Sequence, residues 1–167
     1  MAGRITKSEA QLRPDPRYND KTLAKFINCV MKDGKKSVAQ KSVYDALDII
    51  EGRLKKEEGD GENIPKDGLD VFLRAIDNVR PNVEVRSKRV GGANYQVPMQ
   101  VSQRRRMSLC FRWIITAARS ESGRPMAQRL ARELYDAARG EGKAMNTREQ
   151  THRMAEANKA FAHFGSW

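Results

Sequence analysis

The sequence predicts a mainly α-helical protein, a six-helix bundle with one long β-hairpin arm inserted between helices three and four. Apolar residues recur at helical spacing in five segments of the 167-residue chain, and a capping-box spacing indicates a sixth helix. Only Pro81–Val101 alternates apolar and polar residues with a period of two, on both sides of a Gly91-Gly92 pair. That pattern is typical of a β-hairpin with a tight turn. We expect a basic N-terminal arm over residues 1–18 and a single helical domain over residues 19–167.

The first half of the domain predicts three helices. Asn19 or Asp20 is expected to cap the first helix, and Gly34 to end it, because glycine favours the left-handed position after a helix. The second helix begins near Ser37, and residues 55–67 are expected to form a solvated loop because they are charged and lack periodicity. The three apolar stripes are Leu23, Phe26, Ile27, Val30 and Met31; Ala39, Val43, Ala46, Leu47, Ile50 and Leu54; and Leu69, Phe72, Leu73, Ile76 and Val79, the last in a helix from about Asp67 to Val79.

The second half predicts the ribbon at about residues 83–101 and three further helices. Helix four starts after Ser102, and Pro125 suits the first turn of helix five. Thr147 and Gln150 have the spacing of a capping box, which predicts the start of helix six. The stripes of helices four and five are Met107, Phe111, Ile114 and Ala118, and Met126, Leu130, Leu134 and Ala137.

The charge of the chain is strongly positive and unevenly placed. The net charge is +11 and the isoelectric point is about 10.0, which favours a polyanionic partner, either nucleic acid or an anionic membrane. Residues 80–119 alone hold nine basic residues and one acidic residue. No apolar run approaches the roughly 20 residues of a membrane span, so we expect no membrane-spanning segment. We also expect a nucleic acid and not a membrane as the partner. The N-terminus lacks the apolar core of a secretory signal, so we expect a location in the cytoplasm or inside an organelle.

The densest basic pattern lies in helix four. Arg105, Arg112 and Arg119 are seven residues apart, so they lie on one helix face over about 21 Å at 1.5 Å per residue. Arg104 and Arg106 lie in the first turn of the same helix, where positive charge opposes the helix dipole. A solvated basic face is the alternative for this helix alone. Three basic residues of the ribbon lead into it and favour nucleic acid: Arg86, Lys88 and Arg89.

Other positions leave two interpretations open. Lys35 and Lys36 form a basic corner between two helices, which suits either one phosphate of a larger partner or a turn in water. Tyr95 and Trp113 are able to stack on nucleobases or to join the core, and for Trp113 the core is favoured.

Nothing in the sequence predicts catalysis, a metal site or a cofactor. His152 and His163 are 11 residues apart, which does not match helical metal ligands. Cys29 and Cys110 lie in apolar helical patterns and are expected to be buried free thiols. A small metabolic enzyme is a rival class, but no nucleophile–base motif supports it.

Four long strings resemble the family of the seventh small-subunit ribosomal protein, of bacterial or organellar type. They are PDPRYND at Pro14–Asp20, FINCVMKDGKKSVA at Phe26–Ala39, NVRPNVEVRSKRVGGANYQVP at Asn78–Pro98 and THRMAEANKAFAHF at Thr151–Phe164. The resemblance implies six helices with a β-ribbon arm. It also implies a structural protein, not an enzyme, that acts as a monomer within the ribosome and needs no cofactor. Loop 55–67 and the Gly165-Ser166-Trp167 ending depart from the family's usual pattern, so no RNA role is carried onto the loop.

The resemblance further implies a primary binder of the 3′ major domain of small-subunit ribosomal RNA that nucleates assembly of the subunit head. The protein is expected near the exit site, in contact with exit-site transfer RNA, messenger RNA and small-subunit ribosomal proteins nine and eleven. The exit-site surface is expected at Gly91, Gly92, Tyr95, Arg148 and Arg153. The residues expected to bind ribosomal RNA, with Arg119 added from the arginine row, are Arg4, Arg13, Arg17, Lys35, Lys36, Arg86, Lys88, Arg89, Arg104, Arg105, Arg106, Arg112 and Arg119.

A helical DNA-binding regulator is the alternative function. Such a protein needs base-reading residues near the start of a recognition helix and a dimer surface. Arg104–Arg106 fit the first requirement, but the sequence shows no dimerisation stripe.

Overall fold

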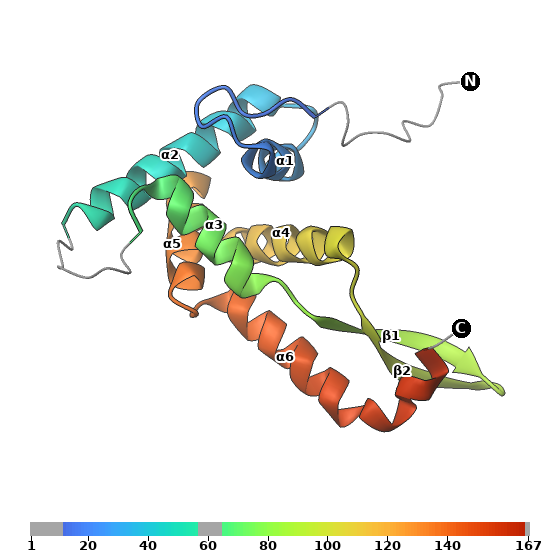
Figure 1. Ribbon diagram of the computed structural model, residues 1–167. Helices are drawn as coiled ribbons and strands as arrows, with labels where there is room; N and C mark the ends of the chain where they lie inside the picture. The colour runs from blue at the N-terminus through green and yellow to red at the C-terminus, as the bar shows by residue number, and fades with distance from the viewer. Residues whose placement is uncertain (1–11, 57–64, 166–167) are drawn as a thin grey trace, which may run out of the picture.

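The computed structural model describes residues 12–56 and 65–165, and these residues form the predicted fold class (Figure 1). A single antiparallel hairpin lies between the third and fourth helices of the described chain. A 3₁₀ helix follows the sixth α-helix. The elements are α1 (Lys21–Val30), α2 (Lys36–Leu54), α3 (Gly68–Val79), β1 (Val83–Val90), β2 (Ala93–Gln100), α4 (Gln103–Ser120), α5 (Met126–Ala138), α6 (Lys143–Ala157) and η1 (Lys159–Gly165).

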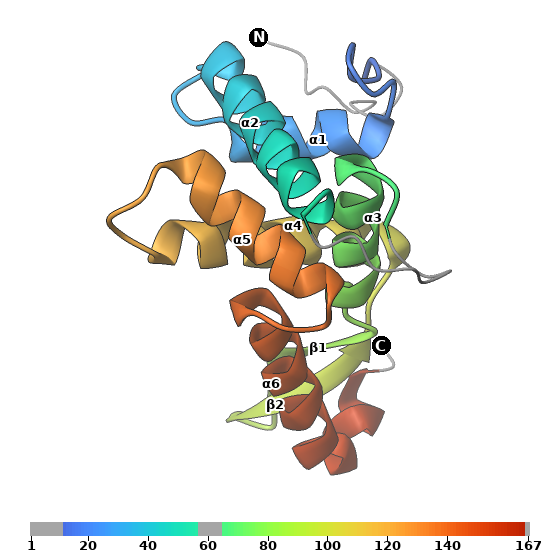
Figure 2. The same cartoon turned by 90° about the vertical axis from the view of Figure 1, so that its left-hand side faces the viewer.

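The helices and the ribbon occupy different parts of the molecule. Helices α1 to α5 pack together, with α5 in contact with α2, α3 and α4. The hairpin projects from one end of this bundle, and α6 runs beside it in both views (Figures 1 and 2). The chain then turns back, so that η1 packs on β2. The ribbon is therefore backed by the C-terminal part of the chain.

Three phenylalanines join the helices of the bundle. Phe26 of α1 is fully buried, and its ring lies edge-on to Phe72 of α3 and Phe111 of α4, at 5.2 Å between centroids in each pair. Edge-to-face aromatic pairs stabilise a core by about 0.5–1.5 kcal/mol beyond the area that they bury. The stripe of α3 is rotated from the prediction, since Val71 and Ala75 are buried whereas Leu69 and Leu73 are only half-buried.

Side chains next to the helix starts explain where α1 and α3 begin. Of the two predicted caps for α1, Asp20 is the one used, and its carboxylate accepts a hydrogen bond from the Leu23 N–H at 2.6 Å. Asp67 caps α3 in the same way. The prediction that Gly34 ends α1 is wrong in position, because the helix ends at Val30 with Met31 as its C-cap; Gly34 and Asp33 have positive φ in the corner between α1 and α2. These local signals are the kind that a sequence reveals directly.

The predicted start of helix six is wrong. The helix begins at Lys143, and Thr147 lies inside it, where its hydroxyl donates to the Lys143 carbonyl. The cap comes from another helix instead: the buried carboxylate of Glu133 in α5 accepts a hydrogen bond of 2.7 Å from the Ala144 N–H. Gly142 makes this approach possible with a φ of 97°, and a side chain there would meet Glu133.

The two cysteines differ in environment. Cys110 is buried as expected, its thiol donates to the Ile76 carbonyl, and burial raises the pKa of the thiol to about 12. The expectation for Cys29 is wrong, because Cys29 is exposed on the solvent side of α1. Within residues 12–56 and 65–165, no helix is long and apolar enough to cross a bilayer.

Glu133 predicts a specific effect on the stability of α6. Replacing Glu133 with Ala leaves the buried Ala144 N–H without its acceptor, and we expect a loss of about 1–3 kcal/mol in the free energy of unfolding. Glu133→Gln keeps an acceptor oxygen, and burial raises the pKa of Glu133, so removing the charge costs little. Urea unfolding monitored by circular dichroism measures both variants. Equal losses for Ala and Gln would contradict the capping role.

Candidate nucleic-acid interface

The turn of the ribbon fixes which side chains share a face. Gly91 and Gly92 have φ values of 60° and 91°, as a two-residue hairpin turn of type I′ requires. The resulting register pairs Arg86 with Val97 and Lys88 with Tyr95. Because directly opposed residues of an antiparallel pair point to the same side, Arg86 and Lys88 of β1 share a face with Tyr95 and Val97 of β2.

That shared face is covered by the C-terminal segment. Val97 is fully buried, and the Tyr95 ring lies 5.2 Å from the rings of both Phe161 and Phe164. The Lys88 amine donates a hydrogen bond of 2.7 Å to the Phe164 carbonyl. Lys88 and Tyr95 are therefore part of the contact between the ribbon and η1. Arg89 lies on the opposite, open face and is exposed.

A second contact fastens the base of the ribbon to α6. The Asn82 N–H donates to Nε2 of His152 at 3.2 Å, so this nitrogen carries no proton. Burial, followed by the positive charge of Arg148, lowers the pKa of His152. The half-buried histidine thus serves as a neutral acceptor for backbone at the ribbon base.

A buried carboxylate joins the ribbon to α4. Glu84 is 7% exposed; its Oε1 lies 2.5 Å from the Arg86 guanidinium and its Oε2 accepts from Nε of Arg105 at 3.1 Å. The ribbon and the start of α4 are therefore joined by one three-residue cluster.

The arginines of the predicted row on α4 differ in their contacts. Arg105 pairs with Glu84, and Arg119 donates to the Val30 carbonyl at the end of α1. Arg112 is exposed between them. Arg106 donates to the Val101 carbonyl, whereas Arg104 is exposed at the helix start. Several of the arginines thus keep part of their hydrogen-bonding capacity inside the protein.

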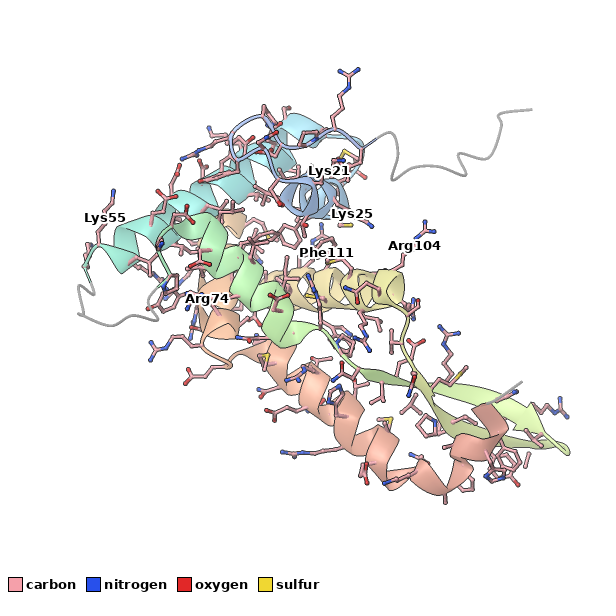
Figure 3. All side chains as sticks on the ribbon, viewed as in Figure 1. Lys21, Lys25, Lys55, Arg74, Arg104 and Phe111 are labelled. Carbon is pink, nitrogen blue, oxygen red and sulfur yellow. The ribbon has the colours of Figure 1, made fainter. Side chains whose placement is uncertain are left out.

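The structure adds two residues that the sequence analysis missed. A groove of about 440 Å³ lies between α1 and the start of α4, and its walls carry Lys21, Lys25 and Arg104 above the side chain of Met107. Figure 3 shows these three basic residues on the side where α1 meets α4. The four-residue spacing of Lys21 and Lys25 places them on one helix face, but only the fold brings that face to Arg104.

The corner residues remain open to solvent. Lys35 and Lys36 are exposed at the start of α2. Lys35 lines a hollow of about 290 Å³ with Lys32, Val38 and Arg119. This hollow connects the corner to the far end of the arginine row on α4.

The N-terminal residues predicted to bind RNA have different surroundings. Arg4 lies outside the described residues. Arg13 is exposed beside a hollow of about 490 Å³ that Lys36 also lines. Arg17 forms an ion pair of 2.5 Å with Asp48 of α2 and its guanidinium lies over the rings of Tyr18 and Tyr44. Its charge is therefore partly balanced inside the protein.

The predicted exit-site residues lie on the ribbon and on α6. Gly91 and Gly92 are exposed at the ribbon tip, and Arg153 is exposed on α6, within reach of Glu149 at 3.8 Å. Arg148 is half-buried. Trp113, for which stacking was left open, is half-buried against the core.

The structure is a helical scaffold that carries basic residues on the ribbon, on α4 and in the groove between α1 and α4, a class suited to holding nucleic acid. The part of the chain that the structure describes has no cluster of three or more His, Cys, Asp or Glu residues placed to bind a metal. Residues 2–159 match the family described as ribosomal protein S7p/S5e. The chain belongs to this family.

Named relatives agree over nearly the whole chain. The chain is 54% identical to the small ribosomal subunit protein uS7 of Rhodopirellula baltica over 97% of its own length and 98% of that protein. It is 54% identical to the protein of the same name from Salinibacter ruber over 91% of both chains, and 53% identical to that of Thermotoga neapolitana over 92% and 93%. The chain is thus a structural ribosomal protein of the small subunit and not an enzyme, as the sequence predicted.

The contact between the ribbon and η1 predicts local loosening when it is removed. Phe164→Ala deletes a ring packed on Tyr95, and we expect amide hydrogens of β1 and β2 to exchange up to about tenfold faster, since such ring pairs contribute about 0.5–1.5 kcal/mol. Exchange in α1 to α5 should stay unchanged. Met154→Ala, at an exposed position of α6, is the control. Unaltered ribbon exchange would show that η1 does not support the ribbon.

His152 predicts loss of stability on acidification. Its pKa is lowered in the folded state, so the unfolded chain takes up the proton first, near pH 6.5. The free energy of unfolding should therefore decrease as the pH falls below about 6.5, and His152→Gln should weaken that decrease. Denaturant unfolding between pH 8 and pH 5 measures it. The control is His163→Gln, which keeps the Asn82–His152 bond; identical profiles for both variants would refute the prediction.

Proposed function

We propose that this protein is a primary binder of small-subunit ribosomal RNA in the 3′ major domain, and that it nucleates assembly of the subunit head. The observation that carries this proposal is the concentration of nine basic residues and one acidic residue in residues 80–119. That segment forms the ribbon and α4, called here the basic side, and the groove at the start of α4 adds Lys21 and Lys25 from α1.

The groove between α1 and α4 suits a sugar-phosphate strand. Lys21, Lys25 and Arg104 supply positive charge from two elements, and the aliphatic side chain of Met107 forms an apolar wall. Phosphate contacts position a protein on nucleic acid without reading its sequence. Recognition therefore depends on the shape of the folded RNA, which matches a rigid surface assembled from α1, α4 and the ribbon.

A finer part of the proposal concerns the exit site. The exposed Gly91-Gly92 tip and Arg148 and Arg153 on α6 are proposed to approach exit-site transfer RNA and messenger RNA, with small-subunit ribosomal proteins nine and eleven as neighbours. Support comes from the fold, since α6 runs beside the ribbon and both extend away from the bundle (Figure 1). Tyr95 then acts by holding the ribbon against η1, because its ring packs on Phe161 and Phe164.

A DNA-binding regulator fits the structure less well. Of the three arginines at the start of α4, Arg106 donates to the Val101 carbonyl and Arg105 pairs with Glu84. Side chains held by their own chain are poorly placed to read bases in a major groove.

The proposal is tested by measuring affinity for RNA at several salt concentrations. The probe is a three-way-junction fragment of the 3′ major domain, compared with a random DNA duplex. Neutralising about eight to ten phosphates gives a log–log salt slope on the order of −6 to −9. A flat salt response, or equal affinity for the DNA duplex, would refute the function.

The groove is tested in the same assay with two charge-matched double variants. Lys21→Gln with Lys25→Gln removes two charges from the groove and should weaken binding to the junction at least tenfold and reduce the slope by about 1.4 to 1.8, since each phosphate contact contributes about 0.7–0.9. Lys55→Gln with Lys56→Gln removes two charges that directly follow α2, and Figure 3 shows Lys55 far from the ribbon. Equal losses for both pairs would mean that only total charge matters.

A further inference from the structure

The place of Glu84 within the basic side requires an explanation. It is the one acidic residue among residues 80–119, and it is nearly buried where the ribbon meets α4. A carboxylate at this place lowers the attraction for a polyanion. Desolvation of a carboxylate also costs free energy unless the charge is paired and hydrogen-bonded. Glu84 is therefore expected to have a role in binding other than its contribution to the net charge.

The contacts of Glu84 show what it does to its neighbours. One oxygen lies 2.5 Å from Arg86 and the other accepts from Arg105 at 3.1 Å. The two arginines come from different elements, 19 positions apart in the sequence, yet both are held on a single carboxylate. Their side chains stay half-exposed, at 53% and 36%, so N–H groups of both guanidiniums remain available to an external anion.

From this geometry we infer that Glu84 is a specificity-determining positioning residue, which holds Arg86 and Arg105 as one pair that contacts phosphates of folded ribosomal RNA. The inference rests on the proposed function. Arginine side chains lose conformational entropy when they are fixed, and Glu84 imposes that loss before RNA binds. Preorganisation of this kind strengthens binding to the matching shape.

Glu84 also weakens binding to RNA of the wrong shape. The cluster of one carboxylate and two guanidiniums carries one net positive charge instead of two, which reduces the counterion-release contribution that any duplex obtains. Specificity is the difference between the two affinities. Both effects of the carboxylate increase that difference.

The test compares the junction fragment of the 3′ major domain with a random RNA duplex of the same length. Glu84→Gln removes one charge and leaves a single acceptor oxygen for two arginines. We expect affinity for the junction to fall about tenfold, the loss of one charge-assisted hydrogen bond. Affinity for the duplex should rise, with a salt slope steeper by about 0.7–0.9.

Two further variants separate position from charge and from folding. Asp70→Asn raises the net charge equally on α3, where Asp70 pairs with Arg74, and should keep the wild-type ratio of the two affinities. Arg86→Lys keeps the charge but loses the planar fork, and should weaken junction binding while the duplex slope stays unchanged. Because Arg86 is half-exposed, Arg86→Lys is expected to fold. If thermal melting shows that Glu84→Gln is unfolded, Arg86→Lys alone tests the positioning role.

The outcomes distinguish this inference from the proposed function. If the wild-type protein prefers the junction and both Glu84→Gln and Arg86→Lys keep that preference, the positioning role is refuted and the proposed function stands. If the wild-type protein has no preference, the proposed function is refuted, and the role of Glu84 with it.

Discussion

A two-stranded ribbon cannot bury both of its faces by itself, and the arrangement of the C-terminal third follows from that constraint. Isolated hairpins are marginally stable in water. Here one face is covered, because β2 places Val97 and Tyr95 against η1, and α6 lies along the same element. The tip stays exposed. In the described chain η1 supports the ribbon, while α6 contacts both the ribbon and the bundle, whose core includes its Ala144 and Met145.

The basic surface depends on its positive residues and equally on the carboxylates and backbone carbonyls of the same chain that bind them. Glu84 holds two arginines, Asp48 holds Arg17, and backbone carbonyls hold Arg106, Arg119 and Lys88. Like charges gathered on one side repel each other, so partners within the chain reduce the cost of assembling that surface. They also limit the conformations of long side chains. The surface offered to a polyanion is consequently shaped as well as charged.

The features that could be predicted are those whose cause lies within a few residues. The Gly91-Gly92 turn, the Asp20 cap and most residues of the five apolar stripes have local causes, and the structure contains them, apart from the rotated stripe of α3. The cap of α6 comes from Glu133, on another helix. The predicted start of α6 was wrong because this cap is not close to it in the sequence. The same limit applies to the candidate surface. The sequence reveals the basic segment at residues 80–119. The hydrogen bond from Lys88 to Phe164, 76 positions away, and the groove that Lys21 and Arg104 both line depend on the tertiary fold.

The order of the elements along the chain has a consequence for synthesis. Chains fold progressively from the N-terminus as they are made, and the ribbon leaves the ribosome well before the residues of η1 that cover it. Until Phe161 and Phe164 emerge, Val97 and Tyr95 have no partner from that segment. The helical bundle is able to pack early, whereas the face of the ribbon that carries Val97 and Tyr95 is covered only after η1 emerges. A nascent chain of this protein therefore acquires its bundle before it acquires the complete surface for its partner.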